Sequence, residues 1–296
     1  MRLFEPSDEA APCGPLRRVM LLVAYDGTSF HGFAAQPGQH TVGGTLAEKL
    51  SSMAGHEVSL TCAGRTDSGV HALGQVVHAD LAEEVLAKWA GRPLTPGMVL
   101  ERLAPSISHQ LGGSVSVIEA RVAPEGFDAR HSATARRYRY ELLRSEWADP
   151  LLRHATWHVP GELDLAAMRI GADALMGEHD FAAFCRQVKG ETGPIVRRVL
   201  STSWSRAAGD ERIWVFSIEA NAFCHQMVRS LVGTLVAVGQ SRIPAGELLS
   251  ILRGADRARA GQPAPARGLC LLGVRYPDSL VPGGTWQPGD DDWPAL

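Results

Sequence analysis

The same order of predicted strands and helices occurs twice along this chain, and this repeat limits its fold more than any other feature. In the first half, alternating and apolar runs predict strands at residues 19–24, 58–62, 75–79 and 115–120, and helices at 42–53 and 95–103. The resulting β-α-β-β-α-β order is that of the ferredoxin-like split unit.

The second half of the chain predicts the same order. Its expected strands are 138–143, 199–204, 213–219 and 271–276, and its expected helices are 163–176 and 224–240, with a short extra helix at 245–252. We therefore expect an α+β protein with two ferredoxin-like, RRM-like (βαββαβ) domains, antiparallel sheets and a cleft between the domains. RRM modules use this architecture to bind single-stranded RNA, but a fold alone does not fix a function.

Composition places the domain boundaries. Residues 1–16 and 281–296 are rich in proline, glycine or acidic residues, and we expect them to be flexible tails. Between them we expect an N-terminal domain at 17–124 and a C-terminal domain at 125–280, joined at Pro124–Phe127.

Bulk properties exclude several classes of protein. The 296 residues carry a net charge of −3, and no run approaches the ~18 consecutive apolar residues of a membrane span. The first residues lack the apolar core of a secretory signal. The five cysteines are odd in number, scattered and without a CxxC pair, which disfavours a disulfide framework and a zinc ribbon. We expect a cytoplasmic, reduced protein.

A tight loop places a carboxylate close to an arginine. Asp67 follows Arg65 by two residues, Gly64 and Gly69 flank the pair, and predicted strands lie on both sides. If the loop lines a cleft, Asp67 is a candidate nucleophile or acid–base group. If it does not, the segment is a capped surface turn.

A second arginine interrupts an apolar helix. Arg229 lies in the middle of the predicted helix at 222–240, with His225 and Gln226 one turn before it. A buried guanidinium needs a partner, and a carboxylate is the natural one. Arg229 either forms a structural ion pair or contacts Asp67 where the halves meet, and we hypothesise the second.

Arginines and tyrosines alternate on the first strand of the second half. The pattern places Tyr138 and Tyr140 on one strand face. We interpret Tyr140 as a core residue, whereas Tyr138 either belongs to the core or stacks on a base. The arginines are a solvated face or a set of phosphate contacts; they are Arg130, Arg136, Arg137, Arg139 and Arg144.

Three clusters, taken together, resemble the tRNA pseudouridine synthase A family. They are residues 64–72, residues 127–130 with 135–140, and residues 220–235. The resemblance implies an enzyme that isomerises uridine to pseudouridine at positions 38, 39 and 40 in the anticodon arm of tRNA. It also implies a homodimer with clefts built from both subunits, no cofactor and no metal, and the lack of a long apolar run leads us to expect no membrane association.

The resemblance also implies roles for single residues. Asp67 matches the nucleophile, Arg229 its partner, and Tyr138 the ring that stacks on the target base. Arg65 matches the residue that helps to displace the target nucleotide, and Arg130, Arg136 and Arg137 are candidate substrate contacts. Whether Asp67 attacks C6 or C1′, or promotes a glycal, stays open, as does whether Tyr138 or a water takes the C5 proton. Departures from the family pattern occur at Ser68, Glu101 and Gln226.

Three other functions remain as alternatives. A non-catalytic RNA-binding protein with two RRM-like units would need exposed aromatic residues on its sheet, and the presence of Asp67 argues for an enzyme. An aspartic protease needs a second Asp-Ser-Gly or Asp-Thr-Gly loop, which the sequence lacks. A hydrolase that uses Ser68 and His71 is disfavoured because residues so close in one loop rarely reach triad geometry.

Overall fold

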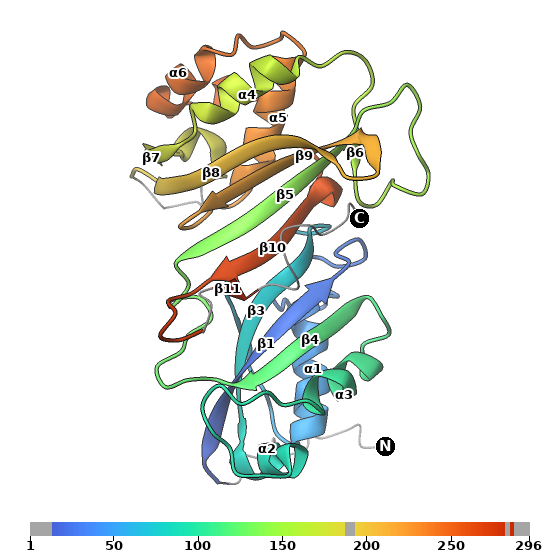
Figure 1. Ribbon diagram of the computed structural model, residues 1–296, viewed down its shortest axis with the longest axis vertical. Coiled ribbons are helices and arrows are strands. Elements are labelled where there is room, and N and C mark those ends of the chain that lie inside the picture. Colours follow the sequence, from blue (N-terminus) through green and yellow to red (C-terminus); the bar gives the residue numbers. More distant parts are fainter. Residues whose placement is uncertain (1–13, 187–192, 282–284, 287–296) are drawn as a thin grey trace, which may run out of the picture.

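The computed structural model describes residues 14–186, 193–281 and 285–286. Within these residues the protein is α+β, with one large and mostly antiparallel sheet of eleven strands. The main path of the sheet is β4-β1-β3-β10-β5-β9-β8-β7. The molecule is elongated, with the first half of the chain at one end and the second half at the other (Figure 1). Most of the two expected tails, residues 1–13 and 287–296, lies outside the described residues.

The first half contains most of the expected elements. They are β1 (Leu16–Tyr25), α1 (Val42–Ala54), β2 (Thr61–Cys62), β3 (His71–Ala82), α2 (Glu83–Ala90), α3 (Leu103–Gln110) and β4 (Val115–Val122). Helix α1 begins where the Thr41 side chain accepts a hydrogen bond from Gly44 N and ends at Gly55, which has a φ of 72°.

The helix expected at residues 95–103 is wrong. Helix α3 begins only at Leu103, and Thr95 opens a turn in which Met98 N donates to Thr95 O. The next residues follow β4, because Leu100 N donates to Ala120 O and Val122 N donates to Met98 O. Backbone pairing with a neighbouring strand therefore overrides the local helix-start signal of Thr-Pro.

The second half contains every element expected for it. They are β5 (Ala135–Leu143), β6 (Trp157–His158), α4 (Leu165–Asp173), β7 (Gly177–Asp180), β8 (Val196–Ala207), β9 (Asp210–Ala220), α5 (Met227–Gly239), α6 (Glu247–Gly254), β10 (Leu269–Arg275) and β11 (Thr285–Trp286), with short 3₁₀ turns at η1 (Ala182–Phe184), η2 (Arg257–Arg259) and η3 (Ala266–Gly268). Helix α5 begins three residues later than expected, because Gln226 adopts a left-handed conformation with a φ of 64°.

Strand β10 joins the two halves into one sheet (Figure 1). It pairs antiparallel with β5, and its start pairs parallel with β3 through Cys270 with His71 and Leu271 with Ala72. The sequence did not indicate this junction, because the repeat shows the order of strands within each half and not the pairing between halves. The start of β3 follows the loop that carries Asp67, so the junction brings the second half to that loop.

Apolar side chains cover both faces of the sheet near the junction. The main core cluster extends through both halves and includes Leu21 and Val23 of β1. Met20 and Leu22 alternate with them and point to the other face, where they pack in a second cluster with Phe127 of the inter-half segment. Phe127 is fully buried, so this segment is a packed part of the structure.

The structure corrects the expectation of a fully reduced chain. Cys185, after η1, and Cys224, before α5, are joined by a disulfide bond. They are 39 residues apart in sequence, yet their Cα atoms lie 5.7 Å apart. Such a pair has no spacing signature, so only the tertiary structure reveals it. Within the described residues, no helix has both the length and the apolar character needed to cross a membrane.

Candidate active site

The loop between β2 and β3 holds Asp67 in a fixed position. At its start, Gln75 Nε2 donates to Gly64 O at 2.7 Å. Beside Asp67, the Thr66 and Tyr25 hydroxyl groups are hydrogen bonded at 2.8 Å. Buried polar contacts of this kind leave a loop few alternative conformations. The carboxylate of Asp67 stays partly accessible, with 25% of its side chain exposed.

The residues after Asp67 anchor the other end of the loop. Ser68 Oγ donates to Phe30 O at 3.1 Å, and Gly69 N donates to the same carbonyl at 3.3 Å. Gly69 has a φ of 77°, and a Cβ atom there would lie 3.3 Å from Cβ of Ala266 in the second half. The Ser68 departure therefore adds a loop-stabilising hydrogen bond, and Gly69 lets the two halves approach closely.

Arg229 reaches Asp67 from the second half. The first turn of α5 presents its side chain, and Nη1 lies 3.3 Å from Asp67 Oδ2. Nε donates to Ala264 O at 2.7 Å, which orients the guanidinium. The side chain of Arg229 is 17% exposed. The structure thus places together the two residues that the sequence suggested as partners.

His225 also contacts Asp67, although its sequence position did not predict a role in the site. Its Nε2 lies 3.4 Å from Asp67 Oδ1. The available signal was its position, one helical turn before Arg229 on the same polar stripe. Helical spacing could not predict which way His225 faces, because Gln226 has a left-handed backbone conformation and His225 therefore lies outside α5.

Tyr138 lies on β5 against the same loop. Its ring packs edge-on against Phe223 with 5.1 Å between the ring centres, and its hydroxyl lies 3.9 Å from where a Cβ atom of Gly64 would be. Burial raises the pKa of Tyr138 above its usual value. The hydroxyl is therefore protonated at neutral pH. Tyr140 is a core residue, and its hydroxyl donates to Pro265 O at 2.7 Å.

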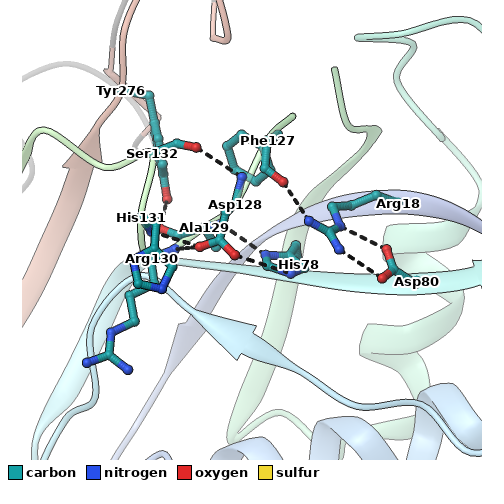
Figure 2. Close-up of polar contacts among 10 residues, drawn as sticks. All are labelled: Arg18, His78, Asp80, Phe127, Asp128, Ala129, Arg130, His131, Ser132 and Tyr276. Atoms are coloured by element: carbon teal, nitrogen blue, oxygen red, sulfur yellow. Dashed lines mark hydrogen bonds and ion pairs between the residues drawn. The ribbon is translucent and has the colours of Figure 1, made fainter. Parts of the chain in front are cut away.

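The remaining arginines near the loop differ in exposure. Arg65 and Arg130 are exposed, whereas Arg137 on β5 is half-buried. The backbone N of Arg130 donates to Asp128 Oδ1 at 2.8 Å. Figure 2 shows that the Arg130 side chain extends away from the polar cluster formed by Asp128, His78 and their neighbours. Its backbone is fixed while its guanidinium reaches outwards, which suits contact with an anionic partner.

The guanidinium of Arg136, an expected substrate contact, is engaged by backbone carbonyls. Its guanidinium donates five hydrogen bonds to backbone carbonyls, with no donor left over for a phosphate. The acceptors are Ala63 O (from Nε at 3.3 Å and Nη2 at 2.8 Å), Ala133 O (3.1 Å), Asn221 O (2.9 Å) and Arg130 O (2.9 Å). Arg136 is therefore a structural link between the Asp67 loop, the inter-half segment and β9. Alternation alone cannot distinguish such a link from a phosphate contact.

A pocket of about 370 Å³ lies in the second half of the chain, between residues of β5, of the 148–158 segment and Arg267. The carbonyl groups of His154 and Arg267, two of its lining residues, contact His71 Nε2 at 2.9 and 3.0 Å. The charged residues that line it are Arg153, Arg267 and Asp149. The described residues contain no group of three or more His, Cys, Asp or Glu side chains arranged to hold a metal ion.

Comparison with known proteins identifies the family. The profile of a family described as tRNA pseudouridine synthase matches residues 21–91 and 172–277, segments that contain Asp67 and Arg229. The chain belongs to the tRNA pseudouridine synthase family. Proteins named tRNA pseudouridine synthase A are similar along most of its length. That of Leifsonia xyli subsp. xyli is 43% identical over 88% of this chain and 92% of its own.

Two further relatives of the same name extend this similarity. The protein from Frankia casuarinae is 45% identical over 88% of this chain and 90% of its own, and that from Solidesulfovibrio magneticus is 42% identical over 95% and 97%. Among solved structures, a Cbf5-Nop10-Gar1 complex matches 87% of this chain and 50% of that chain at 11% identity and a TM-score of 0.35.

Proposed function

We propose that this protein isomerises uridine to pseudouridine in tRNA, at positions 38, 39 and 40 of the anticodon arm, with Asp67 as the nucleophile. The observation that carries the proposal is the contact of Arg229 Nη1 with Asp67 Oδ2 at 3.3 Å, because it joins the two matched segments of the family at one carboxylate. A carboxylate held by a guanidinium from another element is oriented for attack on a substrate atom.

The reaction exchanges one bond between base and sugar for another. The N1–C1′ bond breaks, a C5–C1′ bond forms, and the C5 proton leaves the base. The uridine must first leave the helical stack, which costs a few kcal/mol. Arg65 is exposed and two residues from Asp67 in the same loop, and we assign to its guanidinium the role of filling the space that the base leaves.

Tyr138 supplies the wall on which the flipped uracil stacks. Its ring is fixed against Phe223, and aromatic stacking of a base contributes about 1–3 kcal/mol. Because its hydroxyl is protonated, Tyr138 can donate a hydrogen bond but is not a ready base for the C5 proton.

Positive side chains around the loop support binding of an RNA backbone. Arg65 and Arg130 are exposed, and they offset the net negative charge of the whole chain locally. We propose that residues 17–124 and 125–280 form two ferredoxin-like units with the site at their junction. The active form is a homodimer that works in the cytoplasm without a cofactor.

The test is tritium release from C5-labelled uridine in unmodified tRNA. The wild-type protein is expected to release tritium, and Asp67→Asn is expected to release none. Asp173→Asn, at the exposed end of α4, is the matched control and should behave as wild type. Equal release by wild type and Asp67→Asn would refute the nucleophile. Binding of tRNA without release by either protein would favour the non-catalytic RNA-binding alternative.

A further inference from the structure

Asp67 has a different partner on each of its carboxylate oxygens. Arg229 Nη1 lies 3.3 Å from Oδ2, and His225 Nε2 lies 3.4 Å from Oδ1. A carboxylate offers about four acceptor positions, so two partners leave lone pairs free for a substrate atom. The side chain of His225 is 42% exposed, which places it at the rim of the site rather than in the core.

The segment before α5 holds His225 in this position through covalent and hydrogen bonds. The neighbouring Cys224 is joined to Cys185 by the disulfide bond. The carbonyl of His225 accepts a hydrogen bond from Arg186 N at 2.9 Å. Both contacts come from the chain that follows η1, so the backbone of His225 is fixed by an element outside its own helix.

The next residue adds an unfavourable backbone conformation. Gln226 has a φ of 64°, in the left-handed region, which costs a residue other than glycine about 1–2 kcal/mol. Its Oε1 accepts a hydrogen bond from Arg257 Nη2 at 3.2 Å, which helps to maintain the conformation. Strained backbone that neighbouring contacts maintain is typical of functional sites. Here the left-handed residue separates His225 from α5 and lets both His225 and Arg229 face Asp67.

We propose that His225 is a positioning residue for Asp67. This inference rests on the proposed function of the site. The terminal torsion of an aspartate is broad, so one partner on Oδ2 leaves the carboxylate plane free to rotate. A second contact on Oδ1, at 3.4 Å, restricts this rotation and with it the direction in which the nucleophilic lone pair points. Misplacement of a reacting group by about 1 Å can cost about a hundredfold in rate.

The test compares His225→Leu, which removes the nitrogen, with His225→Gln, whose side-chain amide can place a donor near the position of Nε2. We expect His225→Leu to lower kcat for tritium release about tenfold to a hundredfold, with KM for tRNA changed by less than about twofold. His225→Gln should recover most of the lost kcat. His109→Leu, an exposed histidine at the end of α3, is the matched control and should match wild type.

Three outcomes would overturn the role of His225. The first is that His225→Leu has the kcat of the wild type while Asp67→Asn is inactive in the same assay. This outcome would leave the proposed function intact and remove only the role of His225. The second is an equal loss for His225→Leu and His225→Gln, since a positioning contact should be rescued by the amide. The third is a wild-type protein without tritium release, which overturns the proposed function and this role with it.

Discussion

Arg229 and Asp67 are 162 residues apart in sequence, and their side chains meet at 3.3 Å. The contact depends on the parallel pairing of β10 with β3, because this pairing brings the second half of the sheet to the loop that precedes β3. The guanidinium is fixed in turn by Ala264 O, in the segment that leads to β10. The candidate site is therefore a property of the junction between the halves, and neither half contains it alone.

Replacement of Arg229 tests this dependence. We expect Arg229→Leu to lower kcat for pseudouridine formation about a hundredfold or more, because Asp67 loses its charged partner. Arg229→Lys should be intermediate, since an ammonium keeps the charge but cannot contact Asp67 and Ala264 O as a planar guanidinium does. Tritium release under saturating tRNA measures both. A fully active Arg229→Leu would show that the ion pair is only structural.

Arg136 and Arg130 should respond differently to the same substitution. Arg136→Leu removes five hydrogen bonds to backbone carbonyls and should lower the free energy of unfolding by about 2–4 kcal/mol. Arg130→Leu should change it by less than about 0.5 kcal/mol but weaken tRNA binding and reduce the salt slope of log Kd by about one. Urea unfolding and filter binding at several salt concentrations measure these effects. An Arg136→Leu variant with an unchanged free energy of unfolding would contradict the structural role of Arg136.

The tyrosines should titrate only when the protein unfolds. The chain has four tyrosines, Tyr25, Tyr138, Tyr140 and Tyr276, and burial raises the pKa of each of them. The folded protein binds more protons than the unfolded chain above about pH 10, so stability is full below that pH and falls as the pH rises further. Ultraviolet absorbance should show no tyrosinate at pH 10 in buffer and abundant tyrosinate at the same pH in urea. Early titration of one tyrosine in buffer would contradict this.

Loss of the disulfide bond should destabilise the protein without preventing it from folding. The Cys185–Cys224 bond closes a loop across 39 residues, so the Cys185→Ala/Cys224→Ala double variant should lose about 2–4 kcal/mol of unfolding free energy. Cys62→Ala, at a free and half-buried cysteine, is the control for the removal of a thiol. Urea unfolding with and without a dithiol reductant measures the difference. Reductant should shift the midpoint of wild type and not that of the double variant, and an equal shift in both would contradict the prediction.

Local sequence signals predicted most elements because their causes are local. Helix α1 has a threonine cap and a glycine end that act within one turn, and β1 alternates apolar residues between two buried faces. The helix expected at 95–103 failed because Met98 and Leu100 pair with β4 instead. Ladder bonds to another strand outweigh a capping signal, and residues 95–103 do not reveal that the strand is there.

For the candidate site, the sequence by itself determined the chemical groups: a carboxylate in a glycine-flanked loop, an arginine in an apolar helix and a tyrosine among arginines. Only the tertiary structure decided which groups meet. It places His225 next to Asp67 and joins Cys185 to Cys224. It also directs the N–H groups of Arg136 to backbone carbonyl oxygens. The physical reason is that periodicity and capping act over a few residues, whereas these contacts depend on how β10 and α5 pack against elements far away along the chain.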